Sequence, residues 1–300
     1  MNEKLPKYIA DIDGELWFTE YDRGNMRLSY RVKRILAVEE SKFQHVLMLD
    51  LADFGPTLVL DGCLQSSSVC GHVYNEMIVH IPMLSHPNPK RVLIIGGGDC
   101  GAAREALKYP NATIDMVEID EAVIRLSIEH MPQVSGGPDF DSRLTFKIED
   151  GFAHVERTKN EYDVIVVDSS DPDGPAASLF NEKFYQNIKA AMKPGGIMTC
   201  MSESPILYAG YLRSIRKTLG AIFNLVETYW FATLDYPGGI FSLTYASDSA
   251  PPLATGREFS KNTKYINDDI LQTCFSLPPF VNEILQADSE FVRAEDFPGR

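Results

Sequence analysis

Residues 91–120, RVLIIGGGDCGAAREALKYPNATIDMVEID, contain the pattern that decides the fold. An apolar strand over residues 92–95 leads into a glycine-rich turn at 96–101, and a helix over 102–108 follows. A second strand, 113–117, ends at Glu118, about 20 residues after the glycines. Glycines let a backbone approach a ligand closely, and an acid at this position accepts hydrogen bonds from ribose hydroxyls. The pattern indicates a nucleoside-binding βαβ unit, with a simple tight turn in a parallel sheet as the competing interpretation.

Downstream of this unit, apolar segments alternate with amphipathic ones. Near-continuous apolar strands separated by helices indicate a parallel sheet covered on both faces. We therefore predict an α/β protein with a Rossmann-like (class I methyltransferase-like) parallel sheet and two antiparallel closing strands. The predicted strands are 143–148, 162–167, 197–201, 224–231 and 240–246, with helices over 183–192 and 207–219 and a turn at 193–196.

The residues upstream predict β-structure. Four segments rich in β-branched and aromatic residues are separated by turn signals, and they lie at 16–21, 26–39, 44–51 and 57–60. A helix is expected over 74–84, where apolar residues recur at helical spacing. The chain is accordingly divided into an N-terminal antiparallel β domain, residues 1–70, and a catalytic domain, residues 71–300.

Composition narrows the functional classes. The 300 residues carry a formal net charge of −14, which argues against nucleic acid as a partner and is compatible with a cationic small substrate or simply with solubility. No apolar run approaches the roughly 18 residues of a membrane span, and the N-terminus lacks a secretory signal. The five cysteines are scattered without CxxC spacing, so no zinc site or disulfide framework is indicated, and a cytoplasmic location is expected.

Four acids follow the ends of successive predicted strands: Asp99, Glu118, Asp150 and Asp168. Ligands of such sheets bind at the carboxyl ends of the strands. Glu118 and Asp150 suit the ribose and adenine of a nucleoside. Asp99 lies within the glycine turn, where it would repel the pyrophosphate of a dinucleotide, so NAD and FAD are disfavoured. A nucleoside with a cationic tail fits better.

A proline- and glycine-rich loop, DSSDPDGP at 168–175, adds further carboxylates next to this edge. An Asx-rich turn would account for the composition alone. However, the loop leaves the strand end where catalysis is expected, and this position favours a functional role.

Together these motifs carry a family resemblance. GGGDCGAAREAL, VEID, EDGF, YDVIVVDSSDPDGPAASLF and YPGG make the chain similar to the polyamine aminopropyltransferases, the spermidine and spermine synthase family, from residue 41 to about residue 278. The resemblance implies transfer of an aminopropyl group from decarboxylated S-adenosylmethionine, a co-substrate, to a diamine or polyamine, with release of methylthioadenosine. It further implies no permanently bound cofactor, no metal, and a homodimer or homotetramer.

The resemblance also assigns roles to residues. Asp168 is the implied catalytic base and Tyr74 orients the attacking nitrogen. The implied donor-binding residues are Gln44, Gln65, Gly96, Gly98, Asp99, Glu118, Ile119, Asp150 and Gly151. The implied acceptor-binding residues are Tyr74, Asn75, Asp168, Asp171, Asp235 and Tyr236. Because a sulfonium is already a good leaving group, catalysis requires mainly a deprotonated and aligned amine.

Several positions depart from the family pattern, and most are expected near the acceptor. They are Cys70-Gly71-His72-Val73, Asn75, Cys100, Ala177, Leu234-Asp235 and Leu271. We therefore hypothesise an intact donor half and an acceptor preference shifted from putrescine, with Gly71 opening space for a longer amine. Two alternatives stay open, an S-adenosylmethionine-dependent methyltransferase and a weakly catalytic polyamine- or nucleoside-binding protein.

Overall fold

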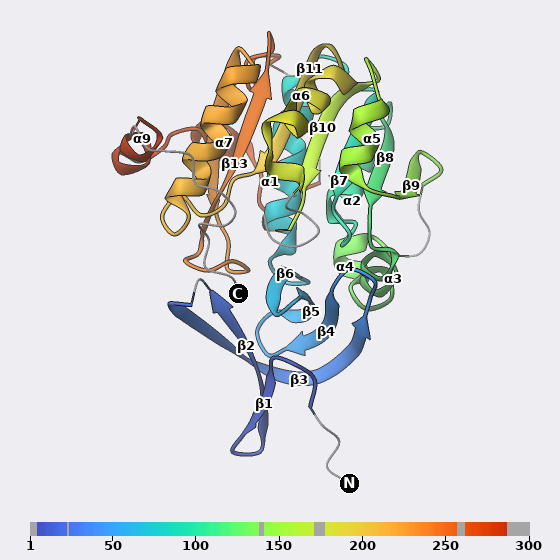
Figure 1. Ribbon diagram of the computed structural model, residues 1–300, viewed down its shortest axis with the longest axis vertical. Helices are drawn as coiled ribbons and strands as arrows, with labels where there is room; N and C mark the ends of the chain where they lie inside the picture. Colours follow the sequence, from blue (N-terminus) through green and yellow to red (C-terminus); the bar gives the residue numbers. More distant parts are fainter. Residues whose placement is uncertain (1–4, 23, 138–140, 171–177, 257–261, 287–300) are drawn as a thin grey trace.

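A computed structural model of the chain describes residues 5–22, 24–137, 141–170, 178–256 and 262–286. Within these ranges two sheets stand one above the other, the N-terminal sheet at the bottom of Figure 1 and the larger sheet above it. No helix in the described ranges is long and apolar enough to cross a membrane.

The N-terminal sheet has six antiparallel strands in sequential order. They are β1 (Ile9–Ile12), β2 (Glu15–Asp22), β3 (Met26–Glu40), β4 (His45–Leu51), β5 (Gly55–Leu60) and β6 (Cys63–Ser67). Four of them match the predicted segments, whereas β1 and β6 were not predicted. The sheet ends at Ser67 and the first helix begins at Gly71, so the predicted division after residue 70 falls in this connection and stays a prediction.

The larger sheet has seven strands in the order β12-β13-β11-β10-β7-β8-β9. Its strands are β7 (Arg91–Gly96), β8 (Thr113–Glu118), β9 (Leu144–Ile148), β10 (Tyr162–Asp168), β11 (Met192–Met201), β12 (Leu225–Ala232) and β13 (Ile240–Ser247). All pairs from β9 to β11 are parallel, and β13 pairs antiparallel with both β11 and β12. The predicted Rossmann-like sheet with closing antiparallel strands is confirmed.

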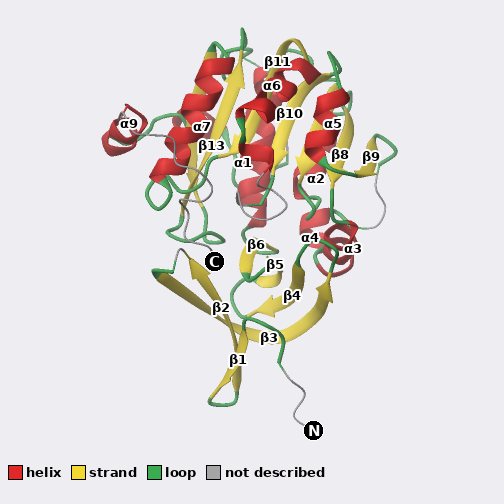
Figure 2. Cartoon of the chain, viewed as in Figure 1, coloured by secondary structure: helices red, strands yellow, loops and turns green. Residues whose placement is uncertain are grey.

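Helices cover both faces of this sheet, as Figure 2 shows by colour. They are α1 (Gly71–Ser85), α2 (Gly101–Leu107), α3 (Glu121–His130), α4 (Pro132–Ser135), α5 (Gly151–Arg157), α6 (Glu182–Ala191), α7 (Ala209–Ile222), α8 (Asp268–Thr273) and α9 (Pro279–Gln286). Because parallel crossovers are right-handed, the crossovers from β7 to β8 and from β10 to β11, which run in opposite directions, place α2 and α6 on opposite faces. Helices α3, α4, α5, α8 and α9 were not predicted.

A small apolar cluster joins the two sheets. Val46, Met48 and Leu58 of the N-terminal sheet pack with Val123 and Leu126 of α3, and all five are buried. This shared core fixes the N-terminal sheet against the helix that follows β8. The carboxyl edge of the larger sheet therefore faces the N-terminal sheet.

Helix α1 connects the two sheets and is also bonded to a segment far along the chain, residues 264–266. The buried carboxylate of Glu76 accepts the backbone N–H groups of Lys264, Tyr265 and Ile266 at 2.8, 2.9 and 3.0 Å. A buried carboxylate needs such donors to offset the loss of water. Residues 264–266 therefore dock directly on the helix that carries Tyr74.

Candidate active site

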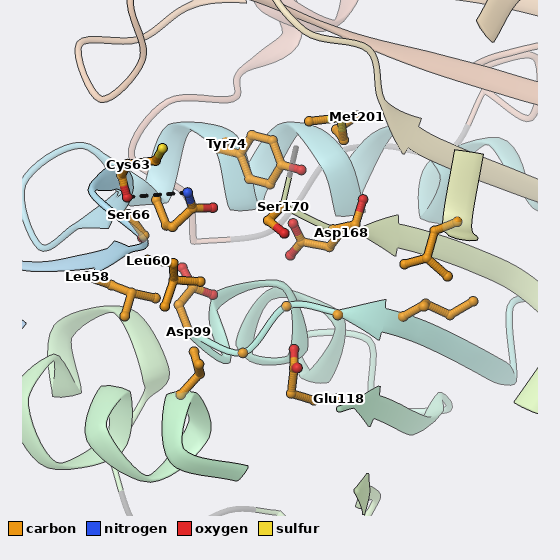
Figure 3. Close-up of a pocket in the computed structure, with 18 of the residues that line it drawn as sticks. Leu58, Leu60, Cys63, Ser66, Tyr74, Asp99, Glu118, Asp168, Ser170 and Met201 are labelled. Carbon is orange, nitrogen blue, oxygen red and sulfur yellow. Dashed lines mark hydrogen bonds between the residues drawn. The ribbon is translucent and has the colours of Figure 1, made fainter. Parts of the chain in front are cut away.

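A pocket of about 1300 Å³, partly open to solvent, lies at the carboxyl edge of the seven-stranded sheet. Strand order reverses there: β8 lies on one side of β7 and β10 on the other. Such a switch point is where open α/β sheets bind ligands. Figure 3 shows Asp99, Glu118 and Asp168 converging from the sheet edge, while Leu58 and Leu60 approach from the N-terminal sheet.

The glycine turn after β7 is pressed against the end of β10. Gly96 has a φ of 81°, and a Cβ there would lie 2.1 Å from the Asp168 carbonyl oxygen. Gly97 N–H donates to the same oxygen at 2.8 Å, and a Cβ on Gly97 would lie 3.0 Å from Asp168 Oδ2. Only glycine permits this approach, which brings the Asp168 side chain over the turn.

Cys100, one of the positions expected to depart from the family pattern, has an unusual backbone conformation. Its φ is 63°, in the left-handed region that non-glycine residues rarely adopt. Its side chain is buried at the start of α2 and does not line the pocket. This departure from the family pattern therefore concerns the conformation of the backbone and not the lining of the pocket.

The environment of Asp168 suits a general base. Burial, the nearby charge of Asp99 and a smaller contribution from Glu118 raise the pKa of Asp168 to about 8, although the Tyr74 hydroxyl opposes the shift. Burial and the charge of Asp168 in turn raise the pKa of Tyr74 well above its ordinary value of 10.0. Tyr74 therefore stays protonated and donates to the carboxylate. A base with a pKa near the working pH is well matched to proton transfer.

Aromatic packing fixes the position of Tyr74. Its ring meets those of Tyr236 and Phe241 edge-on, with centroids 5.7 and 5.9 Å apart. The Tyr236 hydroxyl donates to the Gln65 carbonyl at 3.1 Å. These contacts link α1, β6 and the segment before β13 around one wall of the pocket.

Glu118 ends β8 inside the pocket. Its Oε1 accepts the backbone N–H of Asp120 at 2.9 Å, and burial raises the pKa of Glu118 to about 7. A Cβ on Gly98 would lie 3.2 Å from Glu118 Oε2 and 2.7 Å from Val123 Cγ1. Gly98 therefore leaves the space next to this carboxylate open.

Gln44 reaches the same side of the pocket from the N-terminal sheet. Its Nε2 donates to Asp120 Oδ2 at 3.0 Å, and Ser41 Oγ donates to the same oxygen at 2.6 Å. The other oxygen of Asp120 caps α3 by accepting the N–H of Ala122 at 3.1 Å. Asp120 was not predicted, and it holds Gln44 in place.

At the next strand end, Asp150 caps α5. It accepts the N–H groups of Phe152 and Ala153 at 2.7 and 3.2 Å. Gly151 lies next to Ile95, where a Cβ would come within 2.5 Å of Ile95 Cγ2. Both Asp150 and Gly151 line the pocket, as does Ile119.

Two of the predicted acceptor residues that the structure describes, Asn75 and Asp235, do not line the pocket. Asn75 is buried behind Asp99. Asp235 is also buried, and its carboxylate accepts Ser67 Oγ at 2.6 Å and Ser67 N–H at 3.3 Å; burial raises the pKa of Asp235 to about 7. Asp171 lies outside the described residues, as do Asp173 and Ala177.

Gly71 does not open space for a ligand. It is buried and does not line the pocket, and a Cβ there would lie 2.5 Å from Ser66 Oγ. The Ser66 side chain, which does line the pocket, fills the volume that Gly71 leaves. Leu234 is exposed, and Leu271 packs against the core.

Three residues that the sequence reasoning missed line the other end of the pocket. Glu20 lies on the buried face of β2, two residues from both Phe18 and Asp22. Glu203 follows β11 with a φ of 63°, and its carbonyl accepts the Ser242 backbone N–H at 2.9 Å. The hydroxyl of the third, Tyr208, donates to Asp22. Of the three, only Glu20 carried a sequence signal, because it is a glutamate at an inward position of an alternating strand.

The described lining contains no lysine, arginine or histidine. It contains six carboxylates, those of Glu20, Asp99, Glu118, Asp150, Asp168 and Glu203. A low-dielectric pocket lined by one sign of charge concentrates ligands of the opposite sign. The site therefore selects for cations.

Comparison with known proteins identifies the family. The family model described as the spermine/spermidine synthase domain matches residues 71–255, and that of the spermidine synthase tetramerisation domain matches residues 16–67. The chain belongs to the spermine/spermidine synthase family. The expected family and the expected class of enzyme, a polyamine aminopropyltransferase, are both confirmed.

Individual relatives cover nearly the whole chain. The polyamine aminopropyltransferase of Thermoanaerobacter sp. (strain X514) is 41% identical, spanning 90% of this chain and 98% of its own. That of Bacillus subtilis (strain 168) is 37% identical, spanning 91% and 99%.

Solved structures agree with the fold. A spermidine synthase in complex with the transition state analogue AdoDATO superposes with a TM-score of 0.86 at 35% identity, covering 90% of this chain and 94% of its own. The spermidine synthase of Thermotoga maritima gives a TM-score of 0.84 at 33% identity, covering 90% and 93%.

Proposed function

We propose that this protein transfers the aminopropyl group of decarboxylated S-adenosylmethionine to a diamine or polyamine and releases methylthioadenosine. The observation that carries the proposal is the convergence of Asp99 and Asp168 in one pocket whose described lining has six carboxylates and no basic residue. The intact S-adenosylmethionine of a methyltransferase carries a carboxylate, which would be repelled by Asp99. The decarboxylated donor carries only positive charges in its tail.

In this proposal the donor occupies the glycine-turn side of the pocket. Glu118 accepts hydrogen bonds from the ribose, and Asp150, Ile119 and Gly151 surround the adenine. Gln44 contacts the methylthioadenosine part, while Gly96 and Gly98 let the backbone come close. Asp99 and Gln65 bind the amine of the aminopropyl group. All of these residues line the pocket.

The chemical step uses Asp168 and Tyr74. Asp168 takes a proton from the acceptor ammonium, and the freed nitrogen lone pair attacks the aminopropyl carbon bonded to sulfur. The carbon–sulfur bond breaks, and its electron pair returns to sulfur, so the sulfonium becomes a neutral thioether. Tyr74 orients the nitrogen by its hydroxyl, and the buried site keeps the amine from being reprotonated by water.

The acceptor lies beyond Asp168, toward Tyr236, Glu203 and Glu20. Carboxylates at both ends of this region suit an amine with a positive charge at each end. The hypothesis of a shifted acceptor rested on the departures at 70–73, 75, 177, 234–235 and 271. None of the described ones lines the pocket, and Ala177 lies outside the described residues. Putrescine and longer amines are therefore both candidate acceptors.

The decisive experiment is a panel of donors and acceptors. Purified protein is incubated with decarboxylated S-adenosylmethionine and, separately, with putrescine, cadaverine, agmatine, diaminopropane or spermidine, and products are identified by mass spectrometry. We expect methylthioadenosine and one aminopropylated amine in equal amounts. Methyl transfer from intact S-adenosylmethionine, or binding of amines without turnover, would overturn the proposal.

We further propose a cytoplasmic homo-oligomer, a dimer or tetramer. The match of residues 16–67 to a tetramerisation domain and the free state of all five cysteines support this. Light scattering on the purified protein distinguishes the two sizes from a monomer.

A further inference from the structure

Asn75 is almost completely buried, with 1% of its surface exposed, and it lies behind the pocket. Its Nδ2 donates to the Gly71 carbonyl at 3.0 Å and to Asp99 Oδ2 at 3.3 Å. The side chain therefore contacts the carboxylate that lines the donor side, from the face opposite to the ligand.

The second oxygen of Asp99 is held by the backbone. Asp99 Oδ1 accepts the N–H of Gly101, the first residue of α2, at 2.8 Å. Each oxygen of this carboxylate thus has one neutral donor, one from α1 and one from α2. Together the two bonds fix the plane of the carboxylate without neutralising its charge.

Gly101 also makes room for Asn75. A Cβ on Gly101 would lie 2.0 Å from Asn75 Nδ2 and 2.4 Å from Asn75 Cγ. Any larger residue at position 101 would displace the amide, so the contact between Asn75 and Asp99 depends on this glycine.

The oxygen of the Asn75 amide indicates why an amide is present at this position. Within the described part of the chain, Asn75 Oδ1 is buried without a hydrogen-bond partner. An unsatisfied buried carbonyl is unfavourable, and a small apolar residue would avoid it. Rotating the amide would place this oxygen against the Asp99 carboxylate. The NH2 group must therefore face Asp99, and its bond to Asp99 is the gain that offsets the unsatisfied oxygen.

We propose that Asn75 is a positioning residue, which orients Asp99 for the amine of the donor and so sets donor affinity rather than acceptor affinity. The inference rests on the proposed function and changes the role expected for Asn75, that of an acceptor contact. A neutral amide orients a carboxylate without cancelling its charge, whereas lysine or arginine would compete with the ligand for it.

The kinetic test compares Asn75→Ala with Ser85→Ala. Ser85 is a matched control because it is also buried on α1, donates to the Ile81 carbonyl at 2.7 Å and does not line the pocket. We expect Asn75→Ala to raise the donor KM about tenfold, as for loss of a bond to a charged group, with kcat and acceptor KM changed less than about twofold. Ser85→Ala should leave all three constants unchanged at matched folded fraction.

A double-mutant cycle tests the route of the effect. If Asn75 acts through Asp99, Asn75→Ala should add less than about twofold to the donor KM in the Asp99→Asn background. An equal effect in both backgrounds would overturn the proposal. So would a rise in acceptor KM instead of donor KM, or a change matched by Ser85→Ala.

Calorimetry separates this inference from the proposed function, because it requires no turnover. Asn75→Ala should weaken decarboxylated S-adenosylmethionine about tenfold and leave methylthioadenosine, which lacks the amine, unchanged. Equal weakening of both ligands overturns the inference while leaving the proposed function intact. Failure of wild-type protein to transfer any aminopropyl group, with this difference in binding preserved, would overturn the proposed function alone.

Discussion

The two sides of the pocket are built in different ways. On the proposed donor side, Asp99, Glu118 and Asp150 each lie within a few residues of a strand end, and backbone N–H groups of the next helix or turn hold their carboxylates. On the proposed acceptor side, Glu20 comes from the N-terminal sheet and Glu203 from the segment after β11. The carboxylates of the first side are specified locally, whereas Glu20 reaches the pocket only when the N-terminal sheet packs over the larger one.

This difference predicts which side of the pocket tolerates amino-acid substitutions. A side chain at Gly96 would place its Cβ 2.1 Å from the Asp168 carbonyl oxygen, so this position cannot change without moving the turn or β10. A glutamate on β2 can be exchanged without disturbing the sheet edge. Substitutions on the two sides should therefore have separable effects on donor and acceptor.

The largest effect is expected at Asp168, where the two sides meet. Asp168→Asn removes the base but keeps the shape, so kcat should fall about 10²- to 10⁴-fold. Single-turnover release of methylthioadenosine measures this step directly. A loss below tenfold would show that another group takes the proton.

The donor side is tested by Asp99→Asn. Loss of the charge-assisted bond to the donor amine should raise the donor KM about 10- to 100-fold and leave the acceptor KM within about twofold. Initial rates at varied donor, with saturating acceptor, give the constant. Equal increases in both KM values would mean that the two sides are not separable.

The acceptor side is tested by Glu20→Gln. We expect the acceptor KM to rise about 3- to 10-fold while the donor KM stays constant, because a carboxylate far from the reacting carbon contributes mainly to binding. Glu15→Gln is the control, since Glu15 lies on the same strand in an exposed ion pair with Arg31. No difference between the two variants would place the acceptor elsewhere.

The smallest effect concerns stability and pH. A carboxyl whose folded pKa is raised, here from 3.8 to about 8 for Asp168, contributes stability that is fully present below pH 3.8 and is lost as pH rises through 8. Without ligands, Asp168→Asn should therefore melt higher than wild type at pH 8, and the difference should shrink toward pH 4.

For a chain of this length, each kcal/mol of change in the free energy of unfolding shifts Tm by about 2 °C. The pKa of the Glu118 carboxyl is also raised, to about 7. Glu118→Gln should therefore also melt higher than wild type at pH 8, with the difference changing over a narrower pH range. A Tm difference that is independent of pH would contradict the assigned cause.

The same contrast explains what the sequence could predict. The glycine turn and the apolar strands at 92–95 and 162–167 are strong local signals, and the Rossmann-like sheet follows from them. Helix α5 was missed because Asp150 was interpreted only as a ligand contact, although its carboxylate also caps that helix. The turn predicted at 193–196 is part of β11, which runs from Met192 through a register shift against β10.

Within the site, the sequence best predicted those residues whose place at the end of a strand determines where their side chains lie. Asp99, Glu118, Asp150 and Asp168 all line the pocket as their strand ends implied. Asp235 was expected at the acceptor but bonds to Ser67, a partner far away in sequence that no local pattern indicates. Glu20 was missed although its inward position on the alternating strand β2 was a local signal, whereas Glu203 carried no such signal.

Three consecutive residues of α1 connect three parts of the molecule. Tyr74 faces the pocket, Asn75 holds the glycine turn through Asp99, and Glu76 receives the backbone of residues 264–266. The helix therefore joins these parts mechanically, because the attachment point of residues 264–266 is only two residues from Tyr74. Shortening the protein before residue 264 would remove the three backbone donors of Glu76 and uncover this part of α1, so the disturbance would begin two residues from Tyr74 although no pocket residue had been altered.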